Sequence, residues 1–383
     1  MSKKSICLVA TAHYTIEVFL LDQIKKLSEV YNVTVVLKAT DPDFLARRGI
    51  KADVIFAPIE RKISLINDVR ALYFLIKFFR NNSFDLVHSV TPKAGLLAML
   101  AALFAGINIR IHMFTGQVWG SRRGLMRWIL KSTDRITALA ATHVLTDSFT
   151  QRIYLINERV ISEEKSSVIA SGSISGVDLE RFKPDNILRK EVREKFGIPM
   201  NELVFLFMAR LTRDKGALVM AEAFSRFVDQ GGEGHLIIVG PDEEKVGQMM
   251  IKLLGDSLSK AHFEDYTRCP EKFMAAADVF CLPSYREGFG TVLINAAAIG
   301  IPAIASRIYG SEEAIQENVT GLLIEAGNSL ELAEKMLLLA ENADLRSELG
   351  TKARQRAEDV FSESTVTGAV LEFYSNVLST VHR

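Results

Sequence analysis

Short apolar runs and amphipathic segments alternate along the first half of the chain. Residues 5–10 form an uncharged, mostly apolar run, which predicts a buried strand, and apolar residues at positions 16, 20, 24 and 27 predict a helix over 16–30. The same alternation predicts further strands at 33–37, 54–58, 85–89, 109–114 and 143–146, and helices at 65–80, 93–105 and 125–140. Strands separated by helix-length segments are typical of βαβ units, so we expect a parallel sheet with helices on both faces.

The pattern starts again after a polar stretch. It predicts strands at 203–208, 235–239, 278–282 and 302–305, helices at 217–230 and 291–299, and three helices at 331–340, 343–359 and 363–381. We therefore predict an α/β protein of two Rossmann-like, doubly wound domains facing a cleft. The expected boundaries are a first domain at 1–172, a linker at 173–186, a second domain at 187–360, and a C-terminal helix at 361–383 that packs back on the first domain. Ligands of such sheets bind beyond the carboxyl ends of the strands.

Composition narrows the class of protein. Apolar residues make up 48% and charged residues 24% of the chain, as in ordinary globular proteins. The three cysteines form no C-x-x-C pair, so a disulfide scaffold and a zinc ribbon are excluded. The longest uncharged apolar stretch, residues 94–109, is shorter than the ~20 residues that span a bilayer, and the N-terminal apolar run is too short for a signal peptide. These features predict a cytoplasmic protein.

The net charge of zero hides an asymmetry between the two halves. Residues 1–170 carry a balance of +9, and the remaining residues carry −9. Such a separation indicates that the first domain binds an anionic ligand or an anionic surface. The alternative is a basic face that only contacts solvent.

Basic side chains follow the strand predicted at 203–208. Arg210, Arg213 and Lys215 come just before the next helix, so they cluster at the carboxyl end of a strand. Fixed cations beside a helix N-terminus suit a diphosphate. A basic loop that faces solvent is the alternative.

A second loop follows the strand at 278–282. Gly288 and Gly290 permit close backbone approach, and the amides of residues 289–291 would point at an anion on the helix N-terminus. Glu287 precedes this turn, where a carboxylate suits sugar hydroxyls better than phosphate. A glutamate that only caps the helix is the alternative.

Together these segments resemble the retaining, nucleotide-sugar-dependent glycosyltransferases of the GT-B fold marked by an E-x7-E motif (family 4 type). The resemblance extends over segments 87–95, 110–116, 175–182, 210–215, 285–290, 296–302 and 318–323. The residues of these segments are most similar to those of bacterial transferases that build O-antigen, capsule or other lipid-linked glycans. The resemblance implies a nucleotide-sugar donor, with UDP as the nucleotide by family frequency, a lipid-linked or glycan acceptor, and no nucleic-acid partner.

The resemblance also implies roles for matching residues. Arg210 and Lys215 would neutralise the departing diphosphate, and Glu287 would hold the hydroxyls of the donor sugar. The loop that meets the phosphates would comprise Gly288, Phe289, Gly290 and Thr291. The second glutamate of the motif, which usually binds the ribose, is replaced here by Asn295, an uncharged hydrogen-bonding residue.

The first domain departs from the family pattern at its own strand ends. Many relatives have a histidine directly before Gly116, where this chain has Thr115. His112 matches a second histidine of some relatives, but strand alternation places it on the side of Phe114 and favours a hydrogen-bonded core position. The first loop lacks the usual glycine pair, and His13 or Thr15 could fill that space. The candidates for contact with the acceptor or the donor sugar are His112, Thr115, Gly116 and Thr15.

The predicted chemistry uses side-chain cations. The seven histidines show no H-x-x-x-H spacing, and no metal site is apparent from the sequence, so Arg210 and Lys215 would stabilise the leaving group in place of a metal. The family implies retention, with the departing phosphate taking the acceptor's proton. A sugar-nucleotide epimerase of the same fold and a catalytically silent binding subunit remain alternatives.

Two basic segments of the first domain carry interleaved aromatic residues. Residues 61–80 contain five basic groups, one acid and four aromatics. Residues 121–131 place Arg122, Arg123, Arg127 and Lys131 around Trp128. Such segments suit an interfacial helix, and we predict that the second one docks peripherally on an anionic membrane. The alternative is that the aromatics pack on the sheet while the charges face water.

Overall fold

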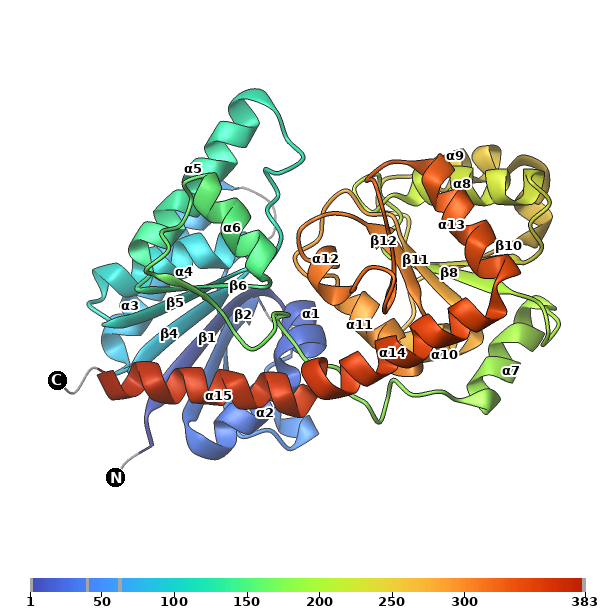
Figure 1. Ribbon diagram of the computed structural model, residues 1–383. Helices are drawn as coiled ribbons and strands as arrows, with labels where there is room; N and C mark the ends of the chain where they lie inside the picture. The colour runs from blue at the N-terminus through green and yellow to red at the C-terminus, as the bar shows by residue number, and fades with distance from the viewer. Residues whose placement is uncertain (1–2, 39–40, 61–63, 381–383) are drawn as a thin grey trace. The chain divides into compact units, whose positions relative to one another are not determined.

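The computed structural model describes residues 3–38, 41–60 and 64–380, which form two compact units (Figure 1). Unit 1 comprises residues up to Gly176 together with the C-terminal helix from Glu363, and unit 2 comprises Val177–Ser362. The division thus falls at 176/177, inside the segment expected to be a linker, and residues 177–186 belong to unit 2.

Unit 1 is built on a seven-stranded parallel sheet of order β3-β2-β1-β4-β5-β6-β7. Its strands are β1 (Ser5–Ala12), β2 (Asn32–Lys38), β3 (Ala52–Phe56), β4 (Leu86–Val90), β5 (Ile109–Phe114), β6 (His143–Thr146) and β7 (Ser166–Val168). The strand order reverses between β1 and β4, the point where doubly wound sheets bind ligands.

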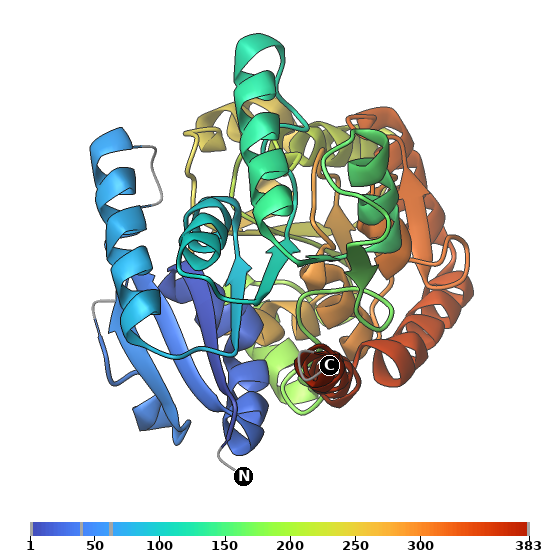
Figure 2. The ribbon, with the colours of Figure 1, turned by 90° about the vertical axis from the view of Figure 1, so that its left-hand side faces the viewer.

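Helices cover both faces of this sheet. One buried cluster contains side chains of α2 (Leu21–Val30) and α15 (Glu363–Ser379), where Tyr374 packs with sheet residues. The opposite cluster contains side chains of α3 (Leu65–Asn81), α4 (Pro92–Phe104), α5 (Gly124–Ala140) and α6 (Phe149–Asn157). Figure 2 shows α4 between α3 and α5. Short helical turns lie at His13–Thr15 (α1), Ile16–Leu20 (a π-helix) and Ala46–Arg48 (a 3₁₀ turn).

Unit 2 repeats the plan with a six-stranded parallel sheet of order β10-β9-β8-β11-β12-β13. Its strands are β8 (Val204–Met208), β9 (His235–Val239), β10 (Ala261–Glu264), β11 (Val279–Leu282), β12 (Ala303–Ser306) and β13 (Gly321–Ile324). Its helices are α7 (Asn186–Phe196), α8 (Ala217–Asp229), α9 (Gly247–Leu254), α10 (Pro270–Ala276), α11 (Thr291–Ile299), α12 (Ser311–Ala314), α13 (Ser329–Glu341) and α14 (Ala343–Phe361), with a 3₁₀ turn at Gly255–Lys260. Both units therefore have the doubly wound, Rossmann-like architecture expected from the alternating pattern.

Candidate functional site

The loops that follow β8 and β11 are locked together at the carboxyl edge of the second sheet. Gly216 has a φ of +73°, and a Cβ there would lie 1.9 Å from the carbonyl oxygen of Pro283. The backbone N–H of Tyr285 donates to the carbonyl of Asp214 at 2.9 Å, and Arg286 pairs with the Asp214 carboxylate at 3.2 Å. Neighbouring strands thus bring two loops that lie about 70 residues apart in sequence into direct contact.

Lys215 and Glu287 meet where these loops touch. The Lys215 ammonium donates to both carboxylate oxygens of Glu287, at 2.6 and 2.7 Å, and the Ser284 hydroxyl donates to Oε1 at 2.8 Å. Glu287 is only 9% exposed, so the pair is largely removed from water. A carboxylate has about four acceptor positions, so Glu287 keeps the capacity to accept a hydrogen bond from a ligand hydroxyl.

Helix α11 begins immediately after this pair. Its N-cap residue is Gly290, which has no side chain to cap the helix, and the hydrogen bonds described for the Glu287 carboxylate are with Lys215 and Ser284. The first amides of the helix are therefore available to another acceptor. A third loop closes on the same turn, because a Cβ on Gly310 would lie 2.4 Å from the carbonyl oxygen of Gly288. Phe289 anchors the turn by packing on Phe361, with ring centroids 5.4 Å apart.

Arg210 has a partner that the sequence did not indicate. Its guanidinium pairs with Glu243 at 2.7 Å, and the backbone N–H of Arg213 donates to Glu244 at 3.0 Å. Both carboxylates belong to the acidic run Asp242–Glu244, which follows β9 after Gly240 and Pro241 and is the signal that could have indicated this pairing. Both predicted cations therefore have carboxylate partners. Thr291 and Asn295 lie on α11, where each is partly exposed.

His112 lies in the core of unit 1. It is buried on β5, where its Nδ1 shares a 2.8 Å hydrogen bond with the Ser89 hydroxyl and its ring lies 4.4 Å from that of Phe114. Burial, with a smaller contribution from His88, lowers the pKa of His112 to about 3, so the ring is neutral. These contacts give His112 a packing role in the structure as it stands.

The other candidates of unit 1 follow strands at the carboxyl edge of its sheet, Thr15 in the short helix α1 after β1 and Thr115 and Gly116 in the loop after β5. Thr15, Thr115 and Gly116 are partly exposed. Close to Thr15 in sequence, the Thr11 and Thr91 hydroxyls share a 2.7 Å hydrogen bond that joins the ends of β1 and β4. Thr91 has a φ of +77°, an outlier for a β-branched residue.

The basic residues around Trp128 divide into two groups. Arg127 and Lys131 pair with Glu158, at 2.9 and 2.5 Å, and lie over the buried ring of Trp119. These contacts hold the loop before α5 in place and engage two of the four basic side chains expected around Trp128. Arg122 and Arg123 are exposed.

Apolar side chains of α3 and α5 are exposed to solvent. Trp128 is 64% exposed and Leu125 72% exposed at the start of α5. At the start of α3, Leu65 is 79% exposed, and Ile66, Val69 and Tyr73 are also exposed. On α3, Phe79 is buried and Phe74 and Phe78 pack against the same core cluster, whereas Tyr73 is exposed. The packing alternative therefore holds for three of the four aromatics of this segment. Residues 61–63 of the predicted basic segment lie outside the described part of the chain.

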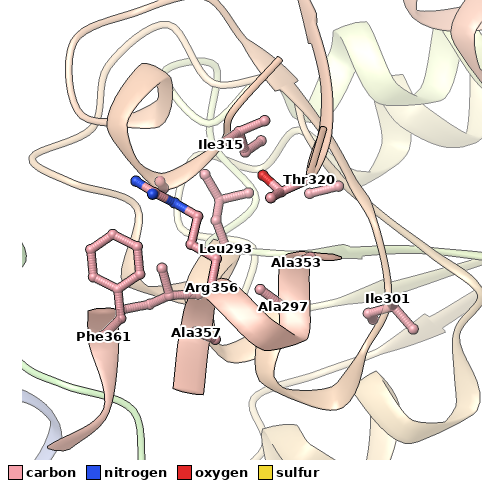
Figure 3. A pocket seen from close by; sticks show the side chains of 12 residues that line it. Leu293, Ala297, Ile301, Ile315, Thr320, Ala353, Arg356, Ala357 and Phe361 are labelled. Atoms are coloured by element: carbon pink, nitrogen blue, oxygen red, sulfur yellow. The ribbon is translucent and has the colours of Figure 1, made fainter. Parts of the chain in front are cut away.

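A small pocket of unit 2 is lined by Phe361, the residue on which Phe289 packs (Figure 3). It is lined mainly by apolar side chains of α11 and α14, together with Thr320 and Arg356. Arg356 donates to the carbonyl of Glu313 at 2.9 Å and lies over the ring of Phe361. Its Nε is buried without a hydrogen-bond partner among the described residues. None of the predicted site residues lines this pocket.

The described residues contain no group of three or more His, Cys, Asp or Glu side chains arranged to hold a metal ion. None of the helices that the structure describes has both the length and the apolar composition needed to cross a bilayer.

Sequence comparisons identify both halves of the chain. Residues 16–181 match the family described as Glycosyltransferase Family 4, and residues 189–356 match the family described as Glycosyl transferases group 1. The chain is 28% identical to the capsular polysaccharide biosynthesis glycosyltransferase CapM of Staphylococcus aureus, over 84% of each chain. It is 29% identical to the UDP-Gal:alpha-D-GlcNAc-diphosphoundecaprenol alpha-1,3-galactosyltransferase of Escherichia coli, over 78% of this chain and 77% of that one.

Solved structures share the fold. HepE of Anabaena in complex with UDP superposes with a TM-score of 0.79 at 20% identity, over 97% of this chain and all of that one. WaaG, a glycosyltransferase involved in lipopolysaccharide biosynthesis, superposes with a TM-score of 0.74 at 16% identity, over 96% and 98% of the two chains.

Proposed function

We propose that this chain transfers a sugar from a UDP-sugar donor to a lipid-linked or polysaccharide acceptor. The chain belongs to the GT-B glycosyltransferases that join a family 4 domain to a group 1 domain. The sugar is a hexose or N-acetylhexosamine, its anomeric configuration is retained, and the product is a precursor of cell-surface polysaccharide. The observation that carries the proposal is the buried Lys215–Glu287–Ser284 network beside the uncapped N-terminus of α11. The E. coli relative, whose substrates are a UDP-sugar and a diphosphoundecaprenol-linked sugar, supports the same substrate classes.

The donor would bind along the carboxyl edge of the second sheet. The residues from Gly288 to Thr291 present their amides to the diphosphate, and Glu287 accepts hydrogen bonds from the sugar hydroxyls. Arg210 exchanges Glu243 for a phosphate oxygen, while Asn295 reaches toward the ribose. These roles follow from the chemistry of each group and its place in the loops.

Breaking the bond between the anomeric carbon and the phosphate oxygen leaves an oxocarbenium-like sugar and UDP. Lys215 and Arg210 stabilise the charge that develops on the diphosphate, which is where fixed cations contribute most to rate. The acceptor oxygen attacks the anomeric carbon from the same face from which the leaving group departs. The departing phosphate takes the proton of the acceptor hydroxyl. We assign no protein base, and we propose that transfer needs no metal.

A lipid-linked acceptor requires contact with a membrane surface. We propose that the exposed apolar residues at the start of α5, with Arg122 and Arg123, dock unit 1 on anionic lipid. The start of α3 adds apolar surface at the same edge, because both helices follow the carboxyl ends of parallel strands. Each arginine near anionic lipid contributes about 1 kcal/mol.

A screen of nucleotide sugars against lipid-diphosphate-linked sugars, followed by mass spectrometry, tests this proposal. We expect an acceptor that gains one glycosyl residue while UDP is released. An isomerised donor would indicate an epimerase. Binding of UDP-sugars without turnover across the screen would indicate a silent binding subunit.

A further inference from the structure

A buried, uncharged network lies at the carboxyl edge of unit 1 and has no role in the chemistry described above. Gln117 follows β5 and Asp147 follows β6, and these strands are neighbours in the sheet. Gln151 of α6 joins the two: its Oε1 accepts the backbone N–H of Asp147 at 2.8 Å, and its Nε2 donates to Oε1 of Gln117 at 3.4 Å. Gln117 is 1% exposed and Asp147 is 3% exposed.

Two polar atoms of this network lack a hydrogen-bond partner among the described residues. They are Nε2 of Gln117, a donor, and Oδ1 of Asp147. Buried polar atoms in folded proteins are almost always paired with protein or ordered water. Two orphans in one connected network are therefore completed either by ordered water or by a polar group of a ligand.

The backbone beside Asp147 is strained. Ser173 is buried with a φ of +72°, and its N–H donates to the carbonyl of Asp147 at 2.6 Å. Such conformations are costly for residues other than glycine, and they cluster where a ligand site must be held in one geometry. Burial also raises the pKa of Asp147 to about 8, so at neutral pH its carboxyl is largely protonated and can both donate and accept.

We propose that Gln117 and Asp147 form a subsite that binds one uncharged polar group of a sugar, either a hydroxyl or an acetamido group. Each of these ligand groups offers an acceptor for the Gln117 amide and a donor for the Asp147 carboxyl. The inference rests on the proposed function, because the sugar belongs to either the donor or the acceptor of the transfer reaction. A desolvated polar subsite discriminates strongly against an analogue that lacks the group, since its own polar atoms are then left unpaired.

Steady-state kinetics of Gln117→Leu and Asp147→Asn test the subsite. We expect each substitution to raise the KM of one substrate about three- to tenfold and to leave the KM of the other within twofold. The affected substrate identifies the source of the sugar group. The matched control is Asp134→Asn, which alters another buried aspartate of unit 1, one that accepts from Trp119 at 2.7 Å, and should leave both KM values unchanged. Unchanged KM values in both test variants would mean that the network holds only internal water.

A second measurement does not depend on turnover. Saturation-transfer NMR with methyl glycosides of glucose and N-acetylglucosamine should detect binding to the wild-type protein and lose the signal in Gln117→Leu. If the wild type binds these sugars through Gln117 but transfers nothing, the proposed function fails and the subsite stands. If it transfers sugar while Gln117→Leu alters neither KM nor NMR binding, the subsite is overturned and the proposed function stands.

Discussion

Replacing Lys215 with methionine leaves the Glu287 carboxylate buried without its cation. Removing one partner of a buried ion pair typically costs 3–5 kcal/mol. Because the Lys215 side chain is 22% exposed and Ser284 still donates to Glu287, we expect the low end, about 3 kcal/mol. Turnover should fall about 100- to 1000-fold, the usual effect of losing one preorganised electrostatic contact.

A double-mutant cycle separates the pair from its surroundings. Lys215→Met, Glu287→Gln and the double variant are compared by urea unfolding, and turnover is measured on the same samples. The double variant removes both charges, so it should be more stable than the sum of the single effects implies, by about 2 kcal/mol. The control is the exposed pair of Arg226 and Glu222 on α8, 2.9 Å apart, where the coupling should stay below about 0.5 kcal/mol. Additive effects of Lys215→Met and Glu287→Gln on stability would refute the buried pair, and near-wild-type turnover in either single variant would refute its role in transfer.

Four further predictions follow from the described contacts. Asn295→Glu should tighten UDP binding in calorimetry, because a charged acceptor hydrogen-bonds the ribose more strongly; unchanged affinity would mean that position 295 does not reach the ribose. EDTA should not slow transfer, since cationic side chains stabilise the leaving group; a loss restored by Mg²⁺ or Mn²⁺ would contradict this. Co-sedimentation with anionic vesicles should weaken with salt and drop when Arg122 and Arg123 become serine, whereas equal recovery with neutral vesicles would remove the membrane role. Burial raises the pKa of Asp134 to about 7 and that of Asp147 to about 8, so at these two carboxyls the folded state binds more protons than the unfolded state above about pH 4. Burial lowers the pKa of His88 and His112 to about 3, which has the opposite effect on stability up to about pH 6.5. Stability should therefore fall as pH rises from about 6.5 to 8, and the Asp147→Asn variant should show a smaller fall over that range; an identical pH profile in that variant would contradict the shift.

Sequence patterning predicted the elements that carry a strong apolar signal. The expected ranges 109–114, 143–146, 235–239 and 291–299 coincide with β5, β6, β9 and α11. The missed strands, β7, β10 and β13, have only three or four residues each, and β7 and β10 are outermost in their sheets and partly exposed, so they lack a long apolar run. Helices α6, α7, α9, α10 and α12 were also missed, because each has 11 residues or fewer and so repeats few apolar positions at helical spacing.

The candidate site was predictable in part. Because a loop that follows a parallel strand always lies at the carboxyl edge, position alone located Lys215 and Glu287. Their mutual pairing and the contribution of Ser284 depend on which strands are neighbours in the sheet. No local sequence pattern specifies that β8 lies next to β11. For the same reason the sequence did not show that Glu243 pairs with Arg210.

The most direct test of glycosyl transfer is a stoichiometric measurement on purified protein with a UDP-sugar and a lipid-diphosphate-linked sugar acceptor. Mass spectrometry counts the glycosyl residues added to the acceptor, a coupled assay counts the UDP released, and NMR of the product reads the new anomeric configuration. Retaining transfer predicts one UDP for each residue added, a product with the anomeric configuration of the donor, and no product from Glu287→Gln. A product with the inverted anomeric configuration would contradict retention. UDP release with no gain in acceptor mass would contradict glycosyl transfer to that acceptor, and full activity in Glu287→Gln would contradict the assignment of Glu287 to the site.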